Sequence, residues 1–118
     1  MKIETYQWGI FKANLDPVRG SEQRGARPVL AVCDEDFNRV MPVVTILPLT
    51  SLKPGRKIYP NEVLLRKGTA GIPNESLVLA HQIRTISKGR LESLYGYIKD
   101  GRIRGLIRGA LKIHLNLD

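Results

Sequence analysis

Short apolar segments alternate with polar turns that contain glycine or proline along most of the chain. Apolar and β-branched residues concentrate in five stretches that are expected to form β-strands, over 8–15, 29–33, 43–49, 62–66 and 76–86. The stretch 29–33 is apolar throughout, so we expect this strand to be buried on both faces. The pattern therefore predicts a chain built mainly of short strands.

The segment 76–86 is expected to be one long strand. Its alternate residues would face opposite sides of a sheet, with Leu77, Leu79 and His81 on one side and Val78, Ala80 and Gln82 on the other. The segment 90–97 is expected to continue as a further strand, although its apolar spacing also fits a helical turn.

Polar segments separate the predicted strands. Residues 18–26 include two glycines and several charged side chains, so they are expected to form an exposed loop. Residues 34–39 begin with three acidic side chains, which is typical of a single helical turn. Glycine, proline and basic residues predict further loops at 51–57 and 67–74.

The last segment has the periodicity of an amphipathic helix. Its apolar positions follow the spacing of one buried face and are Ile103, Leu106, Ile107, Ala110, Leu111 and His114. A second face carries basic residues at four-residue spacing, Arg104, Arg108 and Lys112. Gly105 and Gly109 indicate either close packing against another element, including another subunit, or simple tolerance of glycine in a docked helix.

These elements predict a mostly β fold of five to seven short strands with one C-terminal α-helix. A chain of 118 residues is long enough for one domain, which is expected to span residues 1–118. Strands that come first and a helix that comes last favour a small closed or half-closed barrel over a parallel sheet.

Composition narrows the choice of partner. Lys and Arg number 19 against 11 Asp and Glu, which gives a formal net charge of +8 and indicates a polyanionic partner, nucleic acid before membrane. We expect no membrane span, because the most apolar run, 40–49, is short and contains two prolines. The start of the chain lacks the apolar core of a secretory leader, and the single cysteine, Cys33, is expected to be a buried thiol. A cytoplasmic location is therefore expected.

The sequence offers no support for metal or nucleotide-cofactor chemistry. One cysteine cannot form a cysteine-cluster zinc site, and no phosphate-binding glycine motif is present. The acidic residues 34–36 are consecutive, so their side chains would point in different directions rather than share metal ions. We therefore expect no cofactor and no metal ligands.

Polar side chains that could take part in catalysis or binding cluster before the predicted strand 29–33. Arg27 could bind a phosphate and Glu22 could accept a proton, while Thr50 and His81 lie near the ends of later strands. This inventory suits metal-free RNA cleavage, in which the ribose 2′-hydroxyl attacks the adjacent phosphorus. Structural roles are the alternatives: a loop cap for Glu22, a strand end for Thr50, a core position for His81 and a clamp beside Pro28 for Arg27.

The run LDPVRGSEQRGARPVL at residues 15–30 resembles the opening signature of the MazF/PemK toxins of type II toxin–antitoxin modules. Later blocks keep the family's order and spacing, namely Phe37-Asn38-Arg39, Pro48-Leu49-Thr50-Ser51, Gln82-Ile83-Arg84-Thr85 with Arg90-Leu91, and the closing Ala110–Leu115. The resemblance covers nearly the whole chain. It departs from the family at Gln7-Trp8-Gly9, where members often carry a basic and an acidic residue.

The resemblance implies an SH3-like barrel of the CcdB/PemK type and a homodimer. It also implies sequence-specific, metal-independent cleavage of single-stranded RNA to 2′,3′-cyclic phosphate and 5′-hydroxyl ends, which inhibits translation. The implied partners are the RNA substrate and a cognate antitoxin with an acidic, hydrophobic C-terminal tail, together with which such toxins bind DNA. A gyrase poison of the CcdB type and a non-catalytic RNA-binding barrel are the alternatives.

The resemblance also assigns roles to individual residues. Arg27 matches the catalytic arginine, Thr50 the catalytic hydroxyl and Glu22 the loop glutamate, our candidate base. The positions that would contact RNA are Ser21, Gln23, Arg24, Ser51, Lys53, Gln82 and Arg84. His81 stands where many members carry an acidic residue that in some takes part in cleavage, and an imidazole that titrates near neutrality could replace it as acid or base.

Overall fold

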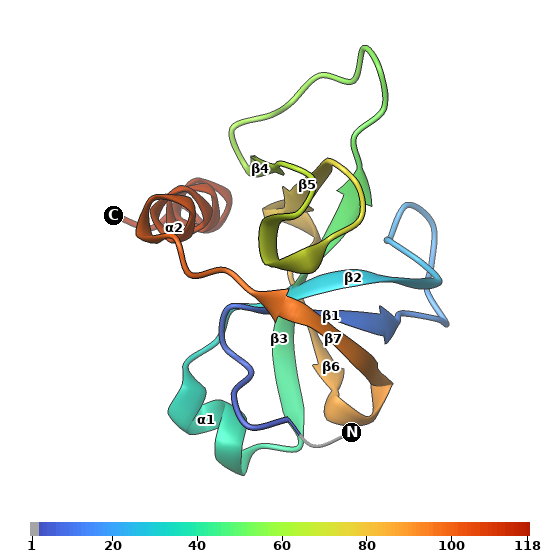
Figure 1. The fold of residues 1–118 in the computed structure, drawn as a ribbon, viewed down its shortest axis with the longest axis vertical. Coiled ribbons are helices and arrows are strands. Elements are labelled where there is room, and N and C mark those ends of the chain that lie inside the picture. The colour runs from blue at the N-terminus through green and yellow to red at the C-terminus, as the bar shows by residue number, and fades with distance from the viewer. Residues whose placement is uncertain (1–2) are drawn as a thin grey trace.

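The computed structural model describes residues 3–118. The expectation about a secretory leader concerned the start of the chain, and its first two residues lie outside the described residues. The strands are β1 (Gly9–Asn14), β2 (Ala26–Ala31), β3 (Val43–Ser51), β4 (Glu62–Leu65), β5 (Ser76–Leu79), β6 (Arg84–Ser87) and β7 (Leu91–Tyr97). The α-helices are α1 (Glu35–Val40) and α2 (Gly101–Leu115), and the 3₁₀ turns are η1 (Thr69–Gly71), η2 (Ala80–Gln82) and η3 (Lys88–Arg90) (Figure 1).

Strand β3 is the central strand of an antiparallel sheet and pairs with three other strands. Its first half pairs with β6, its middle with β2 and its end with β5, so that the strands follow the order β4-β5-β3-β2-β1-β7 with β6 also on β3 (Figure 1). The recorded pairings do not connect β4 with β7, and the sheet is strongly bent but open. The prediction of a mostly β fold with a C-terminal helix is confirmed, whereas full closure into a barrel is not observed among residues 3–118.

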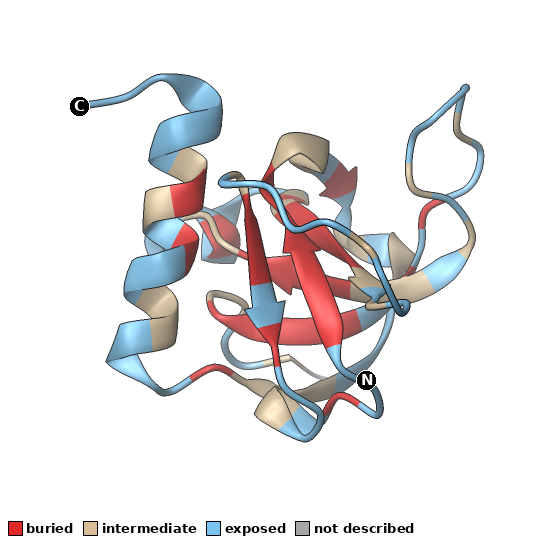
Figure 2. Cartoon of the chain, turned by 90° about the horizontal axis from the view of Figure 1, so that it is seen from above, coloured by how far each residue is buried: buried red, intermediate tan, exposed pale blue. Residues whose placement is uncertain are grey.

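Apolar side chains pack on both sides of the bent sheet. One cluster joins Ile10, Leu30 and Leu47 to Ile107 of α2, and the other joins Phe11, Val29, Ala31 and Ile46 and further residues of β1, β3 and β6. Successive residues of β2 thus enter different clusters, as expected for a strand buried on both faces. Figure 2 shows this buried centre surrounded by exposed loops.

The predicted long strand over 76–86 is wrong. The chain leaves β5 at η2 and turns before it enters β6, and Ile83 N–H donates to the Ala80 carbonyl at 3.2 Å. The physical reason is a change of register along β3: Val78 faces Leu49 and Arg84 faces Ile46, so this segment advances six residues while β3 advances three, and η2 takes up the surplus. His81 and Gln82 therefore lie on a turn and do not alternate between the two faces of a sheet.

Two other boundaries differ from the expected ones. β2 begins at Ala26, because Ala26–Pro28 already pair with β1, and β3 continues to Ser51, because Thr50 and Ser51 pair with β5. The segment 90–97 is confirmed as strand, as β7, rather than helical turn. Arg27 and Thr50 are therefore held by strand pairing and not by loops.

The helix α2 packs through a narrower face than its periodicity predicts. Ile107 and Ala110 are buried, but Leu106 is 49% exposed and His114 is also exposed. Asp100 caps the helix by accepting a hydrogen bond from the Arg102 amide at 2.8 Å. An open groove of about 410 Å³ lies between α2 and β4, bordered by Gly105 and Gly109 and by the apolar side chains that the helix leaves exposed.

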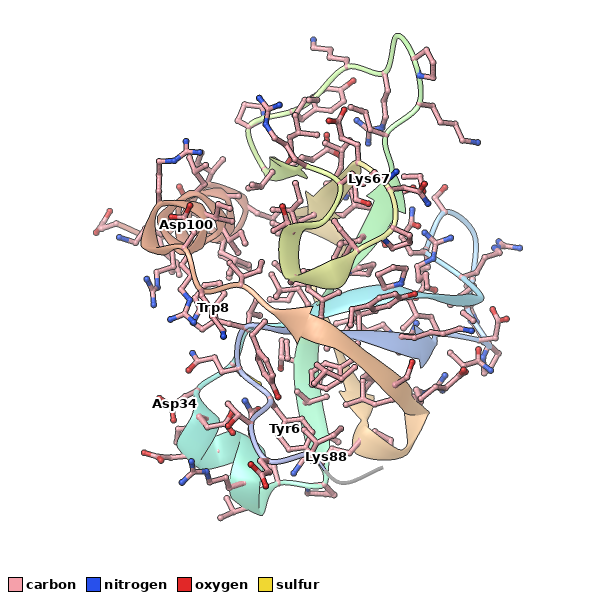
Figure 3. All side chains as sticks on the ribbon, viewed as in Figure 1. Tyr6, Trp8, Asp34, Lys67, Lys88 and Asp100 are labelled. Atoms are coloured by element: carbon pink, nitrogen blue, oxygen red, sulfur yellow. The ribbon has the colours of Figure 1, made fainter. Side chains whose placement is uncertain are left out.

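The basic flank of α2 is anchored on a buried tryptophan. The guanidinium groups of Arg104 and Arg108 lie 5.2 and 5.0 Å from the ring of Trp8, and Arg104 Nε donates to the Ile98 carbonyl at 2.8 Å. Figure 3 places Trp8 beneath α2, at the start of β1, with Asp100 at the near end of the helix. Cation–π contacts therefore stabilise the docking of the helix in addition to apolar burial.

Gly96 marks a close approach between β7 and the η1 turn. A Cβ at this position would lie 2.8 Å from the carbonyl oxygen of Ala70 and 3.0 Å from its carbonyl carbon, both backbone atoms. We expect Gly96→Ala to lower the free energy of unfolding by about 2 kcal/mol, measured by urea denaturation, because the backbone must shift to admit the methyl group. Gly89→Ala is the control, since its nearest neighbour would lie at 3.6 Å. Equal stability of the two variants would contradict the packing argument.

Candidate functional site

A groove of about 430 Å³ opens where β2 begins and β3 ends. Arg27, Thr50, Ser51 and Lys53 line it, together with Pro73, Asn74, Ser76 and Tyr95 from other segments. The pairing of Val29 with Pro48 explains why Arg27 and Thr50 come together. Arg27 lies two residues before Val29 and Thr50 two residues after Pro48, which is the same direction along antiparallel strands, so the two side chains share a face of the sheet. Four of the residues predicted from sequence thus face one cavity.

The guanidinium of Arg27 is held from two sides. Its Nε donates to the Arg24 carbonyl at 2.9 Å, and its Nη1 donates to the Leu49 carbonyl at 3.2 Å and to Oε1 of Gln23. Its Nη2 has no hydrogen-bond partner among residues 3–118. Partial burial lowers the pKa of Arg27 from its usual value. A fixed cation with one amino group unengaged, in a groove wide enough for a ligand, is suited to binding a phosphate.

A second groove of about 250 Å³ is lined by other predicted side chains, with the exception of Ser21 and Arg24. Glu22, Gln23, His81, Gln82 and Arg84 line it, with Pro48 and Ile83. Gln23 connects the two cavities, because it borders the second one while it accepts a hydrogen bond from Arg27 of the first. Arg84 Nη1 donates to the Leu15 carbonyl at 2.9 Å. The predicted residues therefore form two adjoining halves rather than one pocket.

The loop between β1 and β2 carries Ser21, Glu22 and Arg24 on the side of the molecule away from α2 (Figure 1). Glu22 Oε1 accepts a hydrogen bond from the Arg19 amide at 2.7 Å, and Arg24 Nη2 donates to the Gly20 carbonyl at 2.8 Å. Ser21 and Arg24 are exposed and line neither groove. The carboxylate of Glu22 thus supports its own loop and also borders the second groove.

Sequence reasoning missed one buried carboxylate beside this site. The side chain of Glu62, at the start of β4, is 1% exposed. Its Oε1 accepts from Arg56 Nη1 and from the Tyr59 amide, both at 2.9 Å, and its Oε2 contacts Arg56 Nη2 at 2.7 Å and His81 Nε2 at 2.9 Å. Burial raises the pKa of Glu62, but these hydrogen bonds and the charge of Arg56 outweigh it and lower the pKa to about 2.

The described part of the chain provides neither a cluster of metal ligands nor a membrane-spanning helix. Within residues 3–118, no three His, Cys, Asp or Glu side chains come together as a metal ion would require. Over the same residues, no helix combines the length and apolar character that crossing a membrane demands.

Residues 6–114 match the family described as PemK-like, MazF-like toxin of type II toxin-antitoxin system. The chain belongs to this family. It is 33% identical over 108 residues to endoribonuclease MazF of Staphylococcus saprophyticus, which covers 92% of this chain and 88% of the relative. The resemblance that the signature at 15–30 indicated is thereby confirmed.

Solved structures of related toxins share the fold. The crystal structure of MazF from Deinococcus radiodurans aligns with a TM-score of 0.79 at 27% identity, over 98% of this chain and 100% of that one. An endoribonuclease in complex with its cognate antitoxin, from a mycobacterial species, aligns with a TM-score of 0.77 at 23% identity, over 95% of each chain. The bent sheet with its C-terminal helix is therefore the PemK/MazF-like fold.

Proposed function

We propose that this PemK/MazF-like toxin is an endoribonuclease that cleaves single-stranded RNA without a metal ion. The observation that carries the proposal is the groove in which Arg27, anchored on backbone carbonyls, shares a face of the sheet with the Thr50 hydroxyl. Membership of the toxin family and the similarity to an endoribonuclease of similar length support it.

The proposed reaction uses the nucleophile that RNA itself supplies. The ribose 2′-oxygen forms a bond to phosphorus as the bond from phosphorus to the 5′-oxygen breaks, which yields a 2′,3′-cyclic phosphate and a 5′-hydroxyl. Arg27 and Thr50 donate to the phosphoryl oxygens, whose negative charge grows in the transition state. Glu22 accepts the proton of the 2′-hydroxyl. The departing 5′-oxygen also needs a proton, and a guanidinium is a reluctant acid even where burial lowers the pKa of Arg27.

The two grooves provide a path for the strand on either side of the cleaved bond. Ser51 and Lys53 would contact the RNA beside Arg27, and Gln23, Gln82 and Arg84 would contact it in the second groove. Ser21 and Arg24 would reach it from the exposed loop. Cations that hold phosphates set the register, and amide and hydroxyl groups can read base edges, so sequence specificity would arise mainly from the loop and η2.

The partners proposed for this chain follow from its charge and family. A second copy would form a homodimer, and an antitoxin with an acidic, hydrophobic C-terminal tail would cover the basic grooves of the toxin, with DNA binding by the complex. We propose that residues 1–118 act as one domain, in the cytoplasm, where messenger RNA is translated.

Incubation of the purified protein with a long RNA in EDTA tests the proposal. We expect discrete fragments that end in cyclic phosphate, and about a 10- to 100-fold lower rate for Thr50→Val, which removes a hydrogen bond to a charged group. Thr45→Val is the matched control, because Thr45 lies on the same strand but its hydroxyl bonds Thr85 at 2.8 Å, at the other end of β3.

Other outcomes would replace the proposal. Loss of cleavage in EDTA would contradict metal independence. Inhibition of a topoisomerase without RNA cleavage would favour a gyrase poison, and RNA binding without cleavage would favour a non-catalytic barrel.

A further inference from the structure

The position of Glu62 is set independently of the histidine that it contacts. Both carboxylate oxygens bind the fork of Arg56, at 2.9 and 2.7 Å, and one of them also accepts the amide of Tyr59 at 2.9 Å. The side chain is almost fully buried. A carboxylate with this many donors is a rigid acceptor, and it remains ionised because those hydrogen bonds, against the effect of burial, hold its pKa at about 2.

The ring of His81 uses one nitrogen to meet this carboxylate. Nε2 lies 2.9 Å from Oε2 of Glu62, and since an ionised carboxylate only accepts, Nε2 must carry the hydrogen. Nδ1 has no hydrogen-bond partner among residues 3–118. The side chain is 30% exposed and borders the second groove, as Glu22 also does. Nδ1 of His81 is therefore available for a ligand, and the ring lines the groove in which we expect the RNA strand.

We propose that Glu62 is a positioning residue that orients His81, and that Nδ1 of His81 donates the proton taken up by the departing 5′-oxygen. The inference rests on the proposed function and supplies the acid that this reaction lacks. As the bond from phosphorus to the 5′-oxygen breaks, the proton passes from Nδ1 to that oxygen and the ring becomes neutral. The proton of the 2′-hydroxyl goes to Glu22; afterwards Glu22 releases this proton to solvent and the ring takes one proton from solvent, which restores both groups.

The other charged groups around His81 are consistent with this division of roles. Arg56 compensates the charge of Glu62 and shares its Oε2 with His81, whereas Glu22 and Arg84 border the same groove as the ring. His114 of α2 meets His81 edge-on, with ring centroids 6.4 Å apart. Glu62 is the one anion in direct contact with the ring among residues 3–118, so it is the group that orients the ring.

A substrate with a better leaving group tests the acid role. Once the cleaved site is mapped by primer extension, RNA with sulfur in place of the bridging 5′-oxygen at that site needs no proton on departure. On ordinary RNA we expect His81→Gln to be about 100-fold slower than the parent protein, and on the sulfur substrate we expect the two to differ by less than about 5-fold. Arg27→Ala should stay slow on both substrates, because phosphate stabilisation is still needed.

The role of Glu62 is tested with Glu62→Gln. Nitrogen-15 NMR of the imidazole, which needs no substrate, should show hydrogen on Nε2 of neutral His81 in the parent protein and a mixture of both tautomers in Glu62→Gln, since an amide can also donate.

Each failure has a distinct meaning. An unchanged tautomer in Glu62→Gln would overturn the positioning role. Equal slowing of His81→Gln on both substrates would overturn the acid role. If the parent protein does not cleave RNA at all, the proposed function and the acid role fail together, while the NMR measurement still decides whether Glu62 orients the ring.

Discussion

Replacing Arg27 with alanine is expected to lower the rate of RNA cleavage by about 10²- to 10³-fold while the chain stays folded. The guanidinium is fixed before substrate arrives, by hydrogen bonds to the carbonyls of Arg24 and Leu49, so little reorganisation is needed when charge develops on the phosphate. Both carbonyls border open grooves or an exposed loop and can bind water when the side chain is removed. Cleavage of a fluorescent RNA, with circular dichroism to verify folding, measures the effect.

Two further variants separate geometry from net charge. Arg39→Ala removes the same charge from an exposed position on α1 and should change the rate by less than about 2-fold. Arg27→Lys keeps the charge but loses the fork that bonds two carbonyls, so an intermediate loss is expected. If Arg27→Ala and Arg39→Ala cleave RNA at the same rate, the assignment of Arg27 to the catalytic site is wrong.

Acid is expected to weaken the fold through Glu62. A glutamate in the unfolded chain has a pKa of about 4.3, whereas in the folded protein hydrogen bonds, chiefly from Arg56, outweigh burial and lower the pKa of Glu62 to about 2. Because the folded-state pKa is the lower one, the stabilisation is fully present above the unfolded pKa and is lost as the pH falls through the folded value. The difference corresponds to about 3 kcal/mol of unfolding free energy.

Urea denaturation of the parent protein and of Glu62→Gln from pH 7 to pH 2 measures this contribution. The stability difference between them should be constant at neutral pH, decline below about pH 4 and be largely gone at pH 2. Glu35, whose pKa is also lowered because hydrogen bonds from Gln7, Asn38 and Tyr6 outweigh burial, adds acid sensitivity to both proteins and cancels in the comparison. A difference that persists unchanged to pH 2 would exclude Glu62 as the titrating group.

The elements that the sequence predicted well are those decided by local pattern. β-Branched runs bounded by prolines and glycines gave most strands, and the spacing of apolar residues gave the terminal helix. The prediction of one strand over 76–86 failed because the apolar alternation is continuous through η2, whereas the pairing with β3 changes register there, which the local pattern does not reveal. The prediction that Leu106 lies on the buried face of the helix was also wrong, since α2 packs mainly through Ile107 and Ala110.

For the candidate site too, local motifs were predictable from the sequence and tertiary contacts were not. The signature at 15–30 located Arg27 and Glu22, and the block at 48–51 located Thr50, because these residues lie in contiguous motifs. Glu62 stands alone at the start of an apolar strand, and its importance depends on Arg56 and on a histidine 19 residues later that tertiary folding brings to 2.9 Å. The available clue was the position itself, since a carboxylate at the beginning of a buried strand requires a charged or hydrogen-bonding partner.

The division of labour between strands and loop has an evolutionary consequence. Arg27 and Thr50 are held by paired strands, whereas Ser21 and Arg24 project from an exposed loop that can change in sequence without disturbing the sheet. Under the roles proposed for these residues, mutations in that loop would redirect RNA recognition while the residues that break the bond stay unchanged. Diversification of targets among such toxins would then outpace diversification of mechanism.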